Sequence, residues 1–176
     1  KPAENGYTLF SDINWKAGPK GAQGPMMSPI HGSPKTGPVS FIVKMPAGYS
    51  SGLHAHPSNF AGAVVAGTIV HGKSAEETET LSAGGAWTQV ANQSHYTGCT
   101  ADAECIVVGH FDGPFGTNPA EAIHEGELGS VSTQPAQTVF KPLLPSKPQG
   151  PQIHLLSGDL ATGDFRALVK TPVGFK

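Results

Sequence analysis

The sequence predicts an all-β fold, a sandwich or small barrel of short strands, and two observations carry this prediction. Its apolar runs are short and are separated by turns rich in glycine and proline, which is typical of strands joined by tight turns. Helical patterns are few, and the best candidate for a short helix is 119–128. We expect strands at 39–46, 52–57, 61–71, 77–81, 86–91 and 104–112, with turns at Gly48, Gly52, Gly72, Gly84, Gly85 and Asn92.

The composition excludes several classes of protein. Charged residues make up 14% of the 176 residues, and the formal net charge is -2. No basic stripe of the kind that binds nucleic acid is present, and no apolar run approaches the roughly 20 residues that span a bilayer. The sequence also has no G-x-S-x-G motif, no P-loop and no G-x-G-x-x-G motif, and we therefore disfavour a serine or cysteine hydrolase.

The two cysteines, Cys99 and Cys105, flank a short polar turn. They are either a disulfide across a hairpin or two reduced thiols, and we favour the disulfide because no other cysteine is left over. The low charge and a first residue other than Met agree with a processed chain. We therefore expect a secreted or periplasmic protein, where disulfides persist.

An internal repeat links the two ends of the chain. Residues 13–50 align without gaps on residues 139–176, and 11 of the 38 pairs are identical. Matching glycines and prolines at matching spacing indicate repeated turns, so we interpret the pattern as a duplicated domain.

The repeat predicts two domains. Residues 1–130 form a complete domain with an N-terminal arm, and 131–176 form the opening strands of a second copy. The chain stops before the second copy would present its own histidine pair. Such an incomplete sheet has unpaired edges. We therefore expect it to pack on the first domain, on a second copy of the chain as a homodimer, or on the missing C-terminal half.

The candidate functional residues are histidines. His54 and His56 are separated by one residue in an expected strand, so both imidazoles project from the same face. His95 follows a later turn, from which a neighbouring strand can return it to the same cavity. Three neutral imidazoles would form an open site for a divalent transition metal such as Fe, Zn, Mn, Cu or Ni. The alternative is that these histidines are ordinary polar residues at a barrel mouth.

The spacing of these residues resembles the paired motifs of the cupin family. Gly48, His54, His56 and Gly67 match the first motif, G(x5)HxH(x3-4)E(x6)G, with Phe60 in place of the glutamate. Gly84 and His95 match the second, G(x5)PxG(x2)H(x3)N, whose Pro, Gly and Asn are replaced by Val90, Asn92 and Cys99. Residues 81–99 are also similar to two-cupin (bicupin) proteins related to the ChrR-like anti-sigma-factor cupins. The resemblance implies an antiparallel jelly-roll β-barrel that holds a metal, followed here by a truncated second cupin. It does not imply a particular reaction.

Other residues complete the predicted site. Gln89 and Tyr96 are weak candidates for catalytic groups, and Gln89 would also serve as a weak fourth metal ligand. The expected substrate pocket contains Lys44, Phe60, Trp87 and His110. We expect the remaining histidines, which lie beside turns, to be solvated: His31, His71, His124 and His154.

The predicted function is that of a metal-binding cupin with two alternatives. The first is a metalloenzyme, a dioxygenase or a hydrolase, that acts on a small oxygen-rich molecule. The second is a metal or small-ligand sensing module without turnover. Without a carboxylate ligand the metal would keep its two positive charges, which favours an anionic ligand.

Overall fold

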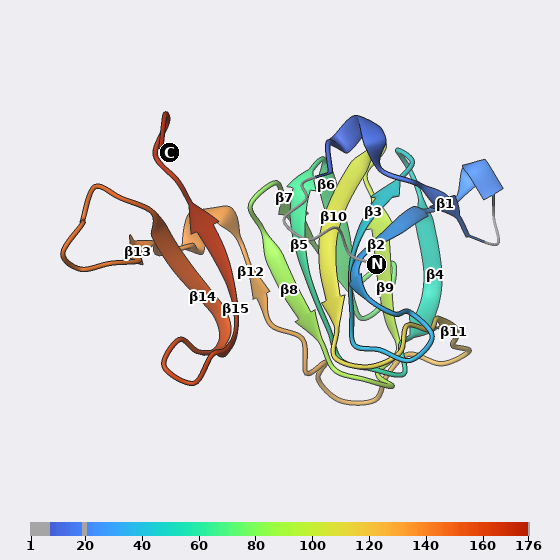
Figure 1. Cartoon of the computed structure of the whole chain (residues 1–176). Coiled ribbons are helices and arrows are strands. Elements are labelled where there is room, and N and C mark those ends of the chain that lie inside the picture. The colour runs from blue at the N-terminus through green and yellow to red at the C-terminus, as the bar shows by residue number, and fades with distance from the viewer. Residues whose placement is uncertain (1–7, 19–20, 176) are drawn as a thin grey trace. The chain divides into compact units, whose positions relative to one another are not determined.

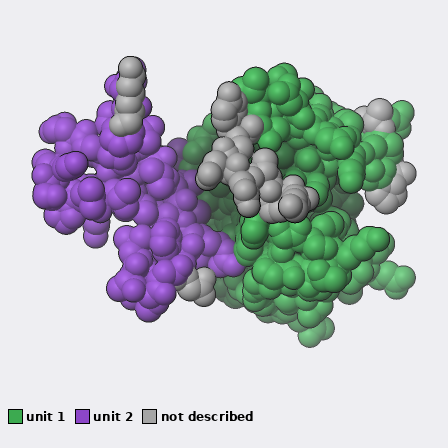
Figure 2. All heavy atoms as spheres, viewed as in Figure 1, with its two compact units in different colours: residues 1–133 green, residues 134–176 purple. Residues whose placement is uncertain are grey.

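The computed structural model describes residues 8–18 and 21–175, which divide into two compact units. The first unit spans 1–133 and the second 134–176 (Figure 2). The division falls close to the predicted boundary after residue 130. That the second unit is a partial cupin repeat stays a prediction.

The first unit consists of two antiparallel sheets, which confirms the predicted all-β fold (Figure 1). One sheet has the order β1-β2-β3-β10-β5-β8-β12, and the other has the order β11-β4-β9-β6-β7. The strands of the first sheet are β1 (Lys16–Ala17), β2 (Met26–Gly32), β3 (Val39–Met45), β10 (Cys105–Phe111), β5 (Phe60–Ala66), β8 (Ala86–Gln89) and β12 (Ser132–Thr133). Those of the second are β11 (Asn118–Pro119), β4 (Ser50–Ala55), β9 (His95–Cys99), β6 (Thr68–Gly72) and β7 (Thr78–Ser82).

Helical structure is limited to short 3-10 turns in the described part of the chain: η1 (Phe10–Asp12), η2 (Gly21–Gln23) and η3 (Pro135–Gln137). None of the described helices has the length and apolar character needed to cross a bilayer.

The strands form because apolar and polar residues alternate along them. In β3, Val39, Phe41, Val43 and Met45 are buried, whereas the residues between them are half-buried. Since successive side chains of a strand point to opposite faces, one face of β3 supplies the core and the other lies towards solvent.

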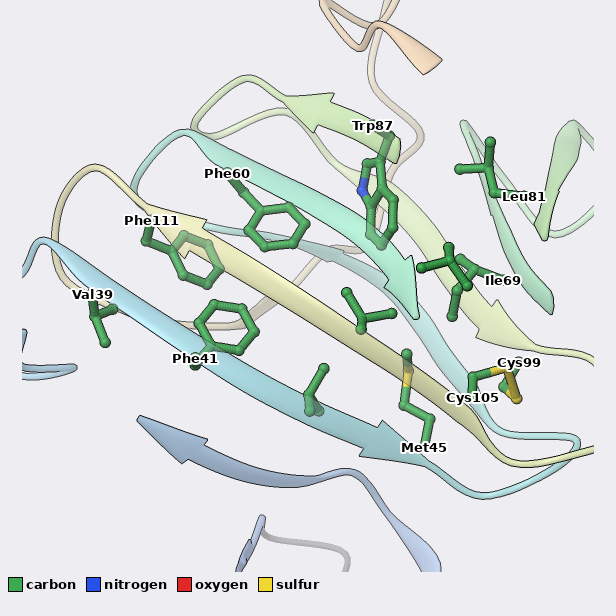
Figure 3. Packing of buried hydrophobic residues seen from close by; sticks show 13 residues of the cluster. Val39, Phe41, Met45, Phe60, Ile69, Leu81, Trp87, Cys99, Cys105 and Phe111 are labelled. Carbon is green, nitrogen blue, oxygen red and sulfur yellow. A yellow bond between two sulfur atoms is a disulfide. The ribbon is translucent and has the colours of Figure 1, made fainter. Parts of the chain in front are cut away.

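Aromatic rings fill the core where β3, β5 and β10 lie side by side (Figure 3). The ring centroid of Phe41 lies 5.9 Å from that of Phe60 and 5.4 Å from that of Phe111. Glycine makes room for these rings: a Cβ atom on Gly109 would lie 2.5 Å from the Phe60 ring and 2.8 Å from the Phe41 ring. The aromatic core therefore depends on a strand residue without a side chain.

A disulfide joins the two sheets at one end. Cys99 closes β9 of the second sheet and Cys105 opens β10 of the first, with their Cα atoms 5.8 Å apart. The structure therefore contains the expected disulfide, in a buried position.

Two predicted elements are wrong. The expected strand 61–71 is divided into β5 and β6 at Gly67, where a positive φ of 74° turns the chain from one sheet to the other. The expected helix 119–128 does not form. Pro119 pairs with His54 of β4 instead, and Ala120 donates a backbone hydrogen bond to the Leu53 carbonyl. The backbone there bonds to the barrel rather than to its own next turn.

The second unit is a three-stranded sheet of β13 (Lys141–Pro142), β14 (Gln152–Asp159) and β15 (Asp164–Lys170). Its pairing repeats that of β2 with β3 at the offset of 126 residues. Met26 pairs with Lys44 as Gln152 pairs with Lys170, and the register shift between Pro29 and His31 recurs between Leu155 and Ser157. The sequence repeat therefore corresponds to a repeated strand pair.

The turn at Gly67 generates a stability prediction. A Cβ atom there would lie 2.6 Å from the Glu104 carbonyl oxygen, whereas a Cβ on Gly48, which also has a positive φ, would meet nothing within 4 Å. Gly48→Ala should cost about 1 kcal/mol of unfolding free energy through backbone strain alone. Gly67→Ala should cost at least about 2 kcal/mol more, because the main chain must shift.

Urea denaturation of the two variants and the wild type measures this difference. Equal losses of unfolding free energy in the two variants would contradict the close packing of Gly67 against β10.

Candidate metal centre

Strand pairing brings the three predicted histidines together. His54 in β4 lies directly opposite His95 in β9, and His56 follows two residues after His54 on the same face. The ring centroids are 4.3 Å apart for His54 and His95, 4.9 Å for His54 and His56, and 5.1 Å for His56 and His95. One nitrogen of each ring lies within 4.8 Å of those of the other two.

Backbone carbonyl groups fix the orientation of all three rings. The Nδ1 of His54 donates to the Gly52 carbonyl at 3.0 Å, that of His56 to Gly116 at 2.6 Å, and that of His95 to Gln93 at 2.9 Å. A carbonyl can only accept a hydrogen bond, so the proton of each neutral ring is on Nδ1. The three Nε2 atoms are therefore left with free lone pairs, the state in which imidazole binds a metal.

Burial keeps these imidazoles neutral. Desolvation lowers the pKa of His54, lowers that of His56 to about 4, and lowers that of His95 to about 3. The repulsion that neighbouring histidines would exert once charged lowers the last two pKa values further, against the opposing effect of the carbonyl hydrogen bonds. At neutral pH the cluster consists of three uncharged nitrogen donors.

A cavity of about 170 Å³ lies beside the three histidines. The first sheet contributes an aromatic wall to the cavity, and the second sheet contributes a polar wall that includes the histidines. The aromatic wall contains Phe41, Phe60, Trp87 and Phe111, and the polar wall contains Ser51, His54, His95 and Thr97. No Asp, Glu, Lys or Arg of the described residues lines this cavity.

The structure places two of the four predicted pocket residues in this cavity. Phe60 and Trp87 line it, with their ring centroids 5.4 Å apart. Lys44 lies on the other face of β3, where its Nζ is 4.8 Å from the centroid of the Trp15 ring. His110 lies on the same outer face but opposite Ser40, four residues before Lys44, and its Nδ1 is 2.9 Å from the Ser40 hydroxyl. Strand alternation therefore places both side chains outside the cavity.

The two candidates for catalytic groups are also placed differently. Tyr96 follows His95 in β9 and points away from the cavity, since alternate residues face opposite sides. Gln89 is buried on the inner face of β8, and its Oε1 has no hydrogen-bond partner within the described residues. Gln89 does influence the neighbouring His71, whose pKa its side chain raises against the larger effect of burial.

Sequence reasoning missed two residues of the site. His71 was expected to be solvated, but it is 1% exposed, and its ring centroid lies 5.6 Å from that of His95. Its nitrogens contact the hydroxyl groups of Thr97 and Ser130, each at 3.2 Å. Because Ser130 donates its own proton to the Thr88 carbonyl, it accepts from His71 Nε2, and Thr97 donates to Nδ1.

Tyr49 is the second missed residue. It precedes β4, lines the cavity, and has a phenol whose pKa is raised by burial. Tyr49 is therefore a neutral hydroxyl group at neutral pH, and it takes the place in the cavity that we had expected for Tyr96.

The donor set fits a divalent transition metal. Three neutral imidazoles with converging Nε2 atoms and fixed Nδ1 protons are suitable ligands for such an ion. His71 is outside this set because both of its nitrogens are already hydrogen-bonded.

The lowered pKa values predict how stability depends on pH in the absence of metal. The unfolded chain binds protons at histidines near pH 6.5, whereas the folded protein keeps His56 and His71 neutral down to about 4. The unfolding free energy should therefore fall as the pH drops through this window, by up to about 1.4 kcal/mol per pH unit for each histidine. Urea denaturation with a chelator at a series of pH values measures the slope.

A variant in which His54 and His56 are both replaced by Gln provides the control, and its slope should be shallower. A wild-type profile that is flat between pH 6.5 and 4 would contradict the burial of neutral imidazoles.

Solved structures with a similar fold include a protein described as a cupin. The oxalate decarboxylase of Lactobacillus farciminis matches 94% of this chain and 64% of that chain, with 11% identity and a TM-score of 0.63. An RmlC-like cupin protein of Ralstonia eutropha matches 71% of this chain and 80% of that chain, with 19% identity and a TM-score of 0.54. At this identity the similarity shows the fold alone.

A protein of Nostoc punctiforme described as a candidate dioxygenase matches 77% of this chain, with 12% identity and a TM-score of 0.60. The match covers 48% of that protein, so this chain spans about half its length. No protein among the curated sequences matches the chain. The family model described as a domain of unknown function, DUF4437, matches residues 10–176, which include parts of both units. The protein therefore belongs to the DUF4437 family and has a cupin-like fold.

Proposed function

We propose that the first unit is a metal-dependent enzyme with a divalent transition metal bound by His54, His56 and His95. The observation that carries the proposal is the set of three Nδ1 hydrogen bonds to backbone carbonyl groups, which leaves the three Nε2 lone pairs free in a cluster whose candidate ligand atoms lie within 4.8 Å of one another. Histidines that served only to fill a core would not need the same nitrogen of each ring to be tied to the backbone.

The substrate class follows from the charge of the donor set. Three neutral ligands leave the charge of a divalent ion uncompensated, so a small molecule with an anionic or ionisable oxygen is the preferred partner. When bound, the ion supplies Lewis acidity for a hydrolase, or oxygen chemistry for a dioxygenase if the ion is iron.

The residues around the proposed site would orient a bound molecule and exclude water from the metal. Burial of His54 and His95 at 6% and 1% exposure removes competing water from the polar wall. Tyr49 lines the same cavity and has a neutral phenol, a type of group that can donate a hydrogen bond or a proton to a bound oxygen.

A metal-dependent binding module without turnover is the second candidate. It is favoured by the absence of lining carboxylates and amines from the described residues, since these are the commonest general acids and bases besides histidine. For either function, the disulfide between Cys99 and Cys105 supports a location outside the reducing cytosol, in a secreted or periplasmic protein.

Metal analysis of protein purified without chelator or affinity resin tests the site. The wild type should hold about one equivalent of a transition metal, in agreement with a single three-histidine site. The double variant His54→Ala, His56→Ala should hold none and keep its β-sheet circular dichroism. The matched control His31→Ala, His124→Ala changes two histidines outside the cluster and should retain the metal.

A double variant at His54 and His56 that still binds one equivalent would refute the assignment. If the wild type contains iron, oxygen consumption in a screen of small ketones, enols and phenols distinguishes the enzyme from the binding module. Binding of such compounds without oxygen consumption or product would favour the binding module.

A further inference from the structure

The size of the cavity limits what can bind beside the histidines. At about 170 Å³ it is close to the size of an engineered apolar cavity of about 150 Å³ that takes up one benzene molecule. A single six-membered ring with a small substituent therefore matches its size.

The two walls of the cavity differ in chemistry. The rings of Phe41, Phe60, Trp87 and Phe111 come from strands of the first sheet, and Figure 3 shows them gathered over β3, β10 and β5. The opposite wall carries the histidines and a few hydroxyl groups from β4 and β9. A ligand that satisfies both walls has an apolar body and one oxygen-bearing end.

Aromatic rings also surround the metal ligand that is nearest to the aromatic wall. The His56 ring centroid lies 5.0 Å from that of Phe111 in an edge-on arrangement, 6.1 Å from that of Phe60 and 6.3 Å from that of Phe115. Phe60 stands where the resemblance to cupins predicts a carboxylate ligand. This exchange removes a charge from the cavity and replaces it with a surface on which a ring can pack.

The absence of charged lining residues argues against ligands rich in oxygen. Lys44 and His110, which were expected in the substrate pocket, lie on the outer face of the first sheet. A dianion such as oxalate would have no cationic side chain in the described cavity, and the carbon-lined wall would leave its second charged group unpaired.

The geometry points to a ligand with one aromatic ring and a single ionisable oxygen, a phenol or aromatic enol. Its ring lies against the wall of Phe41, Phe60 and Phe111, and its oxygen faces the three histidines. This inference rests on the proposed metal site for the oxygen end only. The place of the ring depends on the cavity itself and is testable in protein without metal.

A substitution of Phe115 changes the proposed ring site without removing a side chain from the centre of the core. It is partly buried in the loop after β10, lines the cavity, and lies 5.3 Å from Phe111 between ring centroids. Phe10 is a suitable matched control, because it is an exposed phenylalanine that does not line the cavity.

Fluorine NMR of para-fluorophenol, titrated with metal-free and metal-loaded full-length protein, tests the inference. We expect one site in the metal-free protein and at least about tenfold tighter binding once metal is present, since an oxygen–metal contact is then added. Phe115→Ala should weaken binding about tenfold in both forms through loss of ring contact. Phe10→Ala should leave the affinity unchanged.

Competition between oxalate and para-fluorophenol shows whether the cavity prefers an oxygen-rich dianion or an aromatic phenol. If para-fluorophenol binds neither form and oxalate binds the metal-loaded form, the inference is overturned while the proposed metal site stands. If the wild type takes up no metal but para-fluorophenol still binds and Phe115→Ala weakens it, the ring site stands and the proposed function fails.

Discussion

The pairing of β4 with β9 is the constraint on which the rest of the site depends. It sets His54 directly opposite His95, and the alternation of β4 then brings His56 to the same face. A shift of this pairing by one residue would turn His95 away from the cavity and bring Tyr96 in. β9 is held on its other edge by β6 and at its end by the disulfide to β10, so the register is fixed from three sides.

The two sheets carry different kinds of side chain, and this difference explains how a polar cluster can be buried in a small barrel. The first sheet supplies the rings of Phe41, Phe60 and Phe111, whose burial stabilises the fold through the hydrophobic effect. The buried imidazoles are stabilised by hydrogen bonds to the carbonyl groups of Gly52 in β4 and of Gln93 and Gly116 in loops, each bond worth about 1 kcal/mol in net stability. Without those bonds each buried nitrogen would lose the hydrogen bonds it makes with water, so the orientation of the rings and the stability of the unit have the same origin.

The features of the fold and the site that depend on a local sequence pattern could be predicted from the sequence. Short apolar runs between turns identified the strands at 39–46 and 104–112, which are β3 and β10 of the structure, and the spacing of His54 and His56 identified the shared face. Features that depend on pairing between distant segments were not visible. His71 lies beside Gly72, which marks a turn in the sequence, yet its pairing with Thr97 of β9 buries it. The segment 119–128 has a helical composition, but its backbone finds partners in β4, and such tertiary contacts override local preference.

The repeated strand pair separates residues that the fold needs from residues that the site needs. β14 and β15 keep the pairing and register shift of β2 and β3, and they keep Lys44 as Lys170, which again lies over an aromatic ring. They keep Val43 of the cavity as Val169, but two other cavity side chains are not kept: Ala167 stands at the position of Phe41, and Phe175 at that of Tyr49. Because the strand pair forms without them, the phenyl ring of Phe41 and the hydroxyl of Tyr49 are not required by the local fold, and their place in the first unit is explained by what they line.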